Sequence, residues 1–125
     1  MTNLEKFNRC SAEILSLLYE SFPITVDIER KDYPEYDNGE NREIFSSTII
    51  FLENENFLKI HSKCYQGTYI GVVLTSKGFA ILNFTNPDIL DNQETFGSKI
   101  KDIANTGKDE VIKNLIKVAI TMGIL

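Results

Sequence analysis

The sequence predicts an α+β fold, because stretches with helical periodicity stand on both sides of a central region rich in strand-forming residues. Residues 57–61 and 68–74 carry the β-branched and aromatic side chains that favour strands. The chain has 125 residues, 42% of them hydrophobic, which is enough for one hydrophobic core. We expect residues 1–86 to form one α+β domain. Residues 87–125 are expected to form a C-terminal helical extension that packs on this domain or forms a dimer interface.

The N-terminal segment has the clearest helical pattern in the chain. Thr2 and Glu5 fit a capping box, in which a hydroxyl and a carboxylate satisfy backbone amides at a helix start. Apolar residues then recur at helical spacing, namely Phe7, Cys10, Ile14, Leu17 and Leu18. Pro23 disfavours helical angles in the residue before it, so we expect the helix to end near Ser21. Residues 24–28 alternate apolar and polar side chains and are expected to form a short, half-buried strand.

The middle of the chain is expected to hold a loop, a helix and a β-hairpin. Residues 29–41 carry a proline, an Asn-Gly pair and many charges, which indicates a loop with at most one weak helical turn. Residues 42–53 resume helical spacing, but their β-branched side chains weaken the intrinsic helical propensity, so packing must stabilise this helix. The two central strands are joined by residues 62–67, which include a glycine suited to a turn.

The last third of the chain is expected to be helical. Thr75 can cap a short helix over residues 76–83, and a polar linker follows. A further helix starts at Thr95 or Ser98, and the last helix covers residues 108–122. The last helix is apolar over most of its surface, which leaves three interpretations open. It packs on the first helix, forms a dimer interface, or lies on a membrane surface.

Two short segments resemble parts of winged-helix proteins. The run LENENFL at residues 52–58 is similar to the helix-to-strand turn of many such proteins, with Asn56 where glycine is common. The run LTSKGFAIL at residues 74–82 is similar to the LTxKG segment that leaves the wing strand. On these motifs, the chain resembles small bacterial winged-helix-like proteins of uncharacterised function, over residues 4–83. The resemblance implies a winged-helix-like domain in which the helix at 42–53 occupies the position that enters a DNA major groove.

Acidic charge is concentrated in one stretch of the chain. The net charge is −5, and residues 27–55 carry nine acidic against three basic side chains, a local balance of −6. From residue 61 onward, seven lysines face six acidic residues, a balance of +1. Affinity for nucleic acid depends on Lys and Arg side chains that neutralise phosphates. The charge pattern therefore disfavours nucleic acid as a partner and favours a basic protein.

The candidate contact residues for such a partner lie in the acidic stretch and on the helix that follows it. Tyrosine side chains are included because they are enriched at protein interfaces. The full set comprises Asp32, Tyr33, Glu35, Tyr36, Asp37, Glu40, Glu43, Ser46, Ser47 and Glu53.

The sequence predicts no catalytic residues, no cofactor and no metal site. His61 is the sole histidine, and a catalytic Ser/His/Asp or Cys/His set cannot be assembled without it. Cys10 and Cys64 lack the spacing of a zinc or redox motif. The N-terminus lacks an apolar leader, and no apolar run approaches the ~20 residues that span a bilayer. We therefore expect a cytoplasmic protein without a membrane partner.

The leading hypothesis is a non-enzymatic protein-binding module, specifically an immunity- or antitoxin-like protein that neutralises a basic partner such as a nuclease toxin. The alternative is a dimeric winged-helix DNA-binding transcriptional regulator, joined through its C-terminal helices. The first hypothesis requires an exposed acidic surface around the helix at 42–53. The second requires a basic patch that two subunits share.

Overall fold

The computed structural model describes residues 2–64, 66–85, 94–104 and 109–124, and over these residues the fold is α+β, as predicted. The α-helices are α1 (Asn3–Ser21), α2 (Asn41–Asn54), α3 (Ser76–Leu82), α4 (Phe96–Ala104) and α5 (Asp109–Ile124). The strands are β1 (Val26–Glu29), β2 (Leu58–Lys59), β3 (Ser62–Cys64) and β4 (Thr68–Leu74). Two short 3-10 helices, η1 (Arg30–Asp32) and η2 (Pro34–Tyr36), connect β1 to α2. The boundary predicted between residues 86 and 87 lies outside the described residues.

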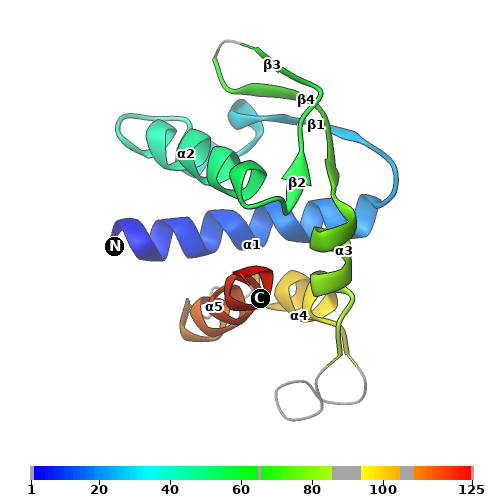
Figure 1. Ribbon diagram of the computed structural model, residues 1–125. Helices are drawn as coiled ribbons and strands as arrows, with labels where there is room; N and C mark the ends of the chain where they lie inside the picture. Colours follow the sequence, from blue (N-terminus) through cyan, green and yellow to red (C-terminus); the bar gives the residue numbers. More distant parts are fainter. Residues whose placement is uncertain (1, 65, 86–93, 105–108, 125) are drawn as a thin grey trace.

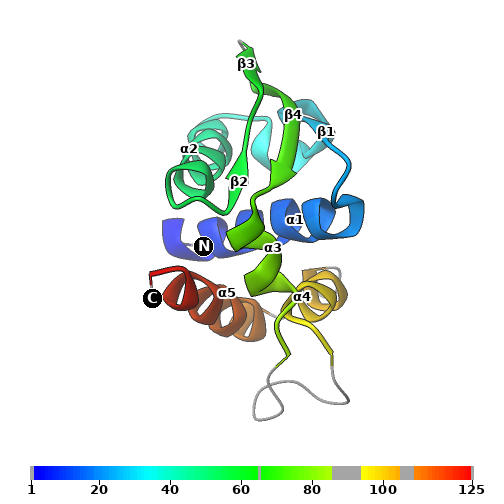
Figure 2. The ribbon, with the colours of Figure 1, turned by 45° about the vertical axis from the view of Figure 1, so that its right-hand side comes forward.

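Helix α1 runs through the middle of the molecule. Figures 1 and 2 show the sheet and α2 on one side of α1, and α4 and α5 on the other. Five of its apolar residues, Cys10, Ala12, Ile14, Leu15 and Leu18, are buried. They belong to one core together with residues of α2, the sheet, α4 and α5. The C-terminal helices therefore pack on the same helix that supports α2 and the sheet.

Strand β4 is the centre of the small antiparallel sheet. It pairs with β1 along one edge and with β2 and β3 along the other. The register places Ile28 opposite Tyr69 and Leu58 opposite Leu74. Two of these residues, Ile28 and Leu58, are fully buried, because the same face of the sheet covers α1 and α2.

The hairpin departs from the sequence prediction in one respect. A continuous strand was expected over residues 57–61, followed by a turn at 62–67, but β2 covers only Leu58–Lys59, and β3 at Ser62–Cys64 lies in the segment expected to be the turn. Gly71 on β4 has a φ of +67°, and a Cβ at this position would lie 2.8 Å from the Cβ of His61. The register with β4 is nevertheless the same on both sides of the gap, with Lys59 opposite Val73 and Ser62 opposite Ile70, and the His61 amide donates to the Ile70 carbonyl at 3.0 Å.

The predicted helix caps are present. The Thr2 hydroxyl accepts a hydrogen bond from the Glu5 amide at 3.1 Å at the start of α1. The Thr75 hydroxyl accepts from the Gly78 amide at 3.0 Å at the start of α3. These bonds satisfy amides that have no partner within the helix.

The two segments that carry the sequence resemblance lie against each other. Asn56, after α2, has a left-handed φ of +63°, which is the conformation for which glycine is common in that turn. The Thr75 hydroxyl donates to the Asn56 carbonyl, and the Thr75 amide donates to the Phe57 carbonyl at 3.1 Å. The turn after α2 and the start of α3 therefore form one connected corner.

Candidate interaction surface

The ten predicted contact residues do not form one continuous surface. Five of them, Asp32, Glu35, Glu40, Glu43 and Ser47, are exposed. Four others, Tyr33, Asp37, Ser46 and Glu53, are half-buried, and Tyr36 is buried. Each group has a different structural role.

The two tyrosines anchor the acidic segment to the core. Tyr36 is only 3% exposed, and its ring lies 5.9 Å from the ring of Phe45 on α2. The ring of Tyr33 lies 5.3 Å from the same phenylalanine, and burial raises the pKa of both phenols. The expectation that Tyr36 contacts a partner is therefore corrected, because its side chain fills the space between η2 and α2.

Two of the predicted acidic residues are neutralised by cations of the same chain. Arg30 Nε donates to Asp37 Oδ1 at 3.1 Å, which ties η1 to the end of η2. Lys63 Nζ lies 2.7 Å from Glu53 Oε1 and ties β3 to the end of α2. Asp37 and Glu53 thus act mainly within the fold, and they add little to a negative surface.

Glu35 contacts a carboxyl group that the sequence analysis did not single out. It forms a hydrogen bond with Glu13 of α1, and burial is the largest cause that raises the pKa of Glu13 to about 8, from an ordinary value of 4.5. The hydrogen bond with Glu35 and the nearby Glu35 charge raise it further, while Arg9 lowers it. The one signal in the sequence for this contact is the position of Glu13, which directly precedes Ile14. In the structure Ile14 is buried, and α1 is covered on several sides. At neutral pH Glu13 is therefore largely protonated.

The exposed face expected for α2 is divided into two flanks. With about 3.6 residues per turn, Glu40, Glu43 and Ser47 lie on one flank. Ser46 and Glu53 lie on the other, which faces the hairpin through the Glu53–Lys63 pair. The side of α2 that faces the core buries Phe45, Thr48, Ile49 and Leu52. This packing stabilises the helix despite its β-branched residues.

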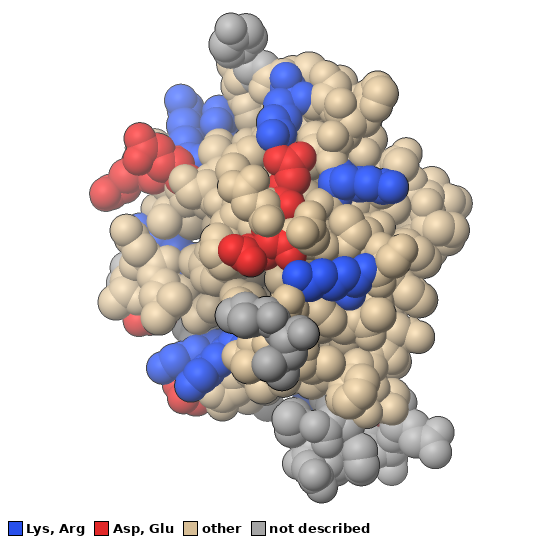
Figure 3. Space-filling view, in the orientation of Figure 1, with Lys and Arg blue, Asp and Glu red and all other residues tan. Residues whose placement is uncertain are grey.

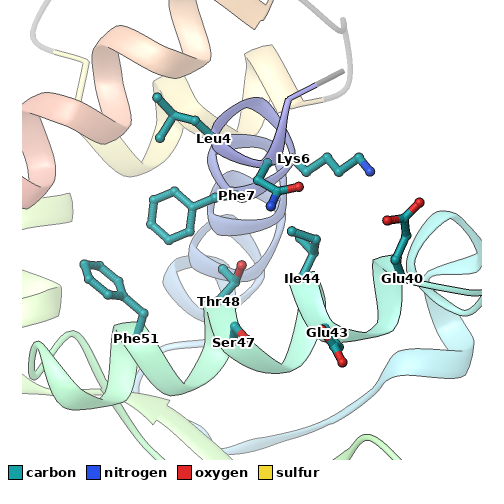
Figure 4. Close-up of a pocket in the computed structure, with 10 residues that line it drawn as sticks. Leu4, Lys6, Phe7, Glu40, Glu43, Ile44, Ser47, Thr48 and Phe51 are labelled. Atoms are coloured by element: carbon teal, nitrogen blue, oxygen red, sulfur yellow. The ribbon is translucent and has the colours of Figure 1, made fainter.

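The first flank of α2 borders a groove, which we call the α1–α2 groove. Its volume is about 570 Å³. Figure 4 shows Leu4 and Phe7 of α1 above Ile44, Thr48 and Phe51 of α2. The complete lining consists of Asn3, Leu4, Lys6, Phe7, Glu40, Glu43, Ile44, Ser47, Thr48 and Phe51.

The α1–α2 groove combines exposed apolar groups with charged groups at its rim. Leu4 is 60% exposed and Phe51 is 37% exposed, and the ring of Phe51 meets that of Phe7 edge-to-face at 5.3 Å. Lys6 Nζ donates to Asn41 Oδ1 at 2.8 Å, which joins α1 to the start of α2. Sequence reasoning missed Leu4, Phe7 and Phe51 as surface residues, because no local pattern shows that the two helices leave this space open.

A second groove lies between α4 and α5 and has the opposite charge. Its volume is about 520 Å³, and its apolar lining includes Val111, Val118 and Met122, with Lys99 and Lys117 beside them. The other apolar face of α5, formed by Ile112, Leu115, Ile116 and Ala119, is buried in the core. Figure 3 shows basic side chains over α5 and an acidic group at the edge of the molecule near the start of α2.

The remaining chemistry-bearing residues do not gather into a site. Within the described ranges, no three His, Cys, Asp or Glu side chains are placed to hold a metal ion. His61 and Cys64 are exposed on the hairpin, whereas Cys10 is buried in α1. None of the helices in the described part of the chain is both long and apolar enough to cross a membrane.

Comparisons with protein-family models, with curated proteins and with solved structures find no match for this chain. Its interaction surface is therefore interpreted from its own geometry and charge.

Proposed function

We propose that this chain is a cytoplasmic, non-enzymatic protein-binding module that binds a basic protein partner through the acidic surface running from η1 to the first turns of α2. The single observation that carries the proposal is the exposure of Asp32, Glu35, Glu40 and Glu43 along this short stretch. Closely spaced carboxylates of this kind raise the association rate of a cationic partner and repel nucleic-acid phosphates.

The acidic surface is held in a defined conformation, which supports a role in recognition. Tyr33 and Tyr36 pack on Phe45, and the Arg30–Asp37 ion pair joins η1 to η2. The Asn41 amide group of α2 donates to the Glu35 carbonyl at 3.0 Å. An ordered surface loses less conformational entropy when it binds, so its charges contribute more of their interaction energy to affinity.

The scaffold that we propose is winged-helix-like. The supporting observations are the order of the elements, the central position of β4 between β1 and the hairpin partner strands, and the corner built by Asn56 and Thr75. In such a scaffold, α2 occupies the recognition position. A specific form of the proposal is an immunity-like protein whose acidic surface masks the cationic surface of a nuclease toxin.

The alternative of a DNA-binding dimer would use the flank of α2 that faces the hairpin. That flank carries Arg42, Ser46 and Glu53, and Glu53 is paired with Lys63. Nucleic-acid readers bring several unpaired basic or amide side chains to one groove. The pairing of Lys63 with a glutamate favours a protein partner over a nucleic acid.

The proposal is tested by affinity capture from native lysate, followed by kinetics with the captured protein. We expect a partner of basic isoelectric point, with an association rate that falls at least about fivefold between about 50 and 300 mM salt. Glu43→Lys should slow association strongly, while Glu110→Lys should not. Both glutamates are exposed and lie in the first turn of a helix, but Glu110 is on α5.

Two results would count against this function. The first is an association rate that does not depend on salt or on residue 43. The second is a mobility shift of duplex DNA by the wild-type protein at low salt, which would favour the regulator instead.

A further inference from the structure

The α1–α2 groove is elongated along α2. Its lining residues on that helix recur at each turn, from Glu40 through Glu43 and Ser47 to Phe51. The two ends are eleven positions apart, which corresponds to about 16 Å along the helix axis. A groove of this length accommodates about three turns of a docked helix, whose contact residues recur at i, i+3 or i+4, and i+7.

The α1–α2 groove brings together two of the large apolar side chains that face solvent. In the part of the chain that the structure describes, five large hydrophobic side chains are exposed, namely Leu4, Ile24, Phe51, Ile70 and Phe84. Two of the five, Leu4 and Phe51, line the same groove although they come from different helices. A contiguous exposed apolar surface with a polar rim is typical of a protein interaction site.

The rim of the groove selects the charge of its occupant. Glu40 and Glu43 are exposed along the α2 side, and Lys6 on the α1 side donates to the neutral Asn41 amide, so the charged groups of the lining sum to −1. The α4–α5 groove provides the contrast, because Lys117 stands beside its apolar residues, together with Lys99, whose Nζ lies 3.9 Å from Glu94 Oε2. The two apolar surfaces of the molecule thus differ in the sign of the charge beside them.

We infer that the α1–α2 groove is the docking site for a cationic amphipathic helix of the partner protein, which inserts apolar side chains between Leu4, Phe7 and Phe51 and places Lys or Arg beside Glu40 and Glu43. This inference rests on the proposed function for the existence of a basic partner, and it adds the structural class of the recognised segment. In this mode, apolar burial supplies most of the affinity and the rim charges set the orientation and the charge preference.

The inference is tested first with a defined probe, a synthetic amphipathic helix of Leu and Lys, titrated into ¹⁵N-labelled protein. We expect the largest amide shift changes at Leu4, Phe7, Ile44 and Phe51. Leu4→Asp should weaken binding about tenfold or more, which is the loss typical of removing one anchor contact. Ile24→Asp is the matched control, because Ile24 is 71% exposed but lies outside the groove, and it should change the affinity less than about twofold.

The charge preference is tested with the same probe after its lysines are replaced by glutamates. We expect the acidic peptide to leave the groove residues unperturbed, and Glu43→Lys to reverse this preference. Shift changes centred away from the groove, or equal effects of Leu4→Asp and Ile24→Asp, would overturn the inference. A dimer of the protein alone that Leu4→Asp dissociates would also overturn it, because the groove would then hold a second copy.

Affinity capture separates failure of this inference from failure of the proposed function. If Leu4→Asp retains the native partner at wild-type affinity while Glu43→Lys still slows its association, the groove is not the docking site, but the binding function stands. If the wild-type protein captures no basic partner, the proposed function fails, and the peptide titration still reports on the groove. Loss of the partner in Leu4→Asp but not in Ile24→Asp supports both.

Discussion

Gly78, in the first turn of α3, lies directly against the backbone carbonyl of Phe57. A Cβ at position 78 would be 2.0 Å from that carbonyl oxygen and 2.9 Å from its carbon. The contact joins the turn after α2 to the start of α3. The Thr75 hydroxyl links the same two segments, because it donates to the Asn56 carbonyl and accepts from the Gly78 amide. The close packing of α3 against the turn after α2 therefore depends on the absence of a side chain at position 78.

The first prediction follows from this contact. Gly78→Ala should destabilise the protein by about 3 kcal/mol, because the added methyl group collides with backbone that cannot move without shifting β2. Urea denaturation, monitored by circular dichroism, measures the change in the free energy of unfolding. Ser76→Ala, at an exposed position in the same helix, is the control and should change stability by less than about 0.5 kcal/mol. Equal stability of Gly78→Ala and the wild type would show that α3 can move away from Phe57.

The second prediction concerns the carboxyl pair of Glu13 and Glu35. The pKa of Glu13 is about 8 in the folded chain, whereas its ordinary value is 4.5. Between these two pH values the folded state holds a proton that the unfolded state releases, so stability falls as the pH rises through this range. The loss is complete above pH 8. Since glutamine resembles the protonated form, Glu13→Gln should remove this loss.

Melting temperatures at pH 5 and pH 8.5 check the prediction for Glu13. At pH 5 the variant and the wild type should be nearly equal, and at pH 8.5 the variant should be more stable by roughly 1 kcal/mol, a value discounted for the solvent-exposed part of the side chain. Glu110→Gln, at an exposed position on α5, removes one negative charge elsewhere and should not reproduce the gain. A parallel pH dependence of Glu13→Gln and the wild type would contradict the assignment.

The helices were largely predictable from the sequence because their signals are local. Thr2 and Thr75 mark helix starts that the structure shows to be capped, and the period of the apolar residues identifies α1 and α2. The extension of the pairing to Ser62–Cys64 was not predicted, because these residues carry no strand-forming pattern of β-branched or aromatic side chains.

The surface was harder to predict than the fold, because it depends on which segments meet. Tyr36 stands among acidic residues, which suggested exposure, but η2 folds back and places the ring on Phe45. Leu4 and Phe51 belong to helices far apart in the sequence, so no spacing relates them. The raised pKa of Glu13 comes first from its burial in the folded chain and then from Glu35, which η2 brings beside it.

The third prediction tests the structural role of Tyr36. Tyr36→Ala should destabilise the protein by about 3 kcal/mol, since it removes a ring from the packed contact with Phe45. Tyr36→Phe keeps the ring and should preserve both most of the stability and the binding of the basic partner. Denaturation and the capture assay measure the two effects. Retained folding together with lost binding in Tyr36→Phe would instead place the hydroxyl at the interface.

The fourth prediction distinguishes the two cysteines by their reactivity. Cys64 is exposed on β3, whereas Cys10 is buried in α1, and burial raises the pKa of the Cys10 thiol far above its ordinary value. Because the thiolate is the reactive form, a thiol reagent such as a disulfide-bonded chromophore should modify one cysteine per folded chain at pH 8. Cys10 should react only when the chain unfolds, and its rate of modification should rise with the concentration of denaturant. Cys64→Ser should abolish the fast reaction. Cys10→Ser should leave the fast reaction unchanged and affect only the packing of the core. Fast modification of Cys10 in the native protein would mean that α1 separates from α2 on the time scale of the reaction, and that the α1–α2 groove opens with it.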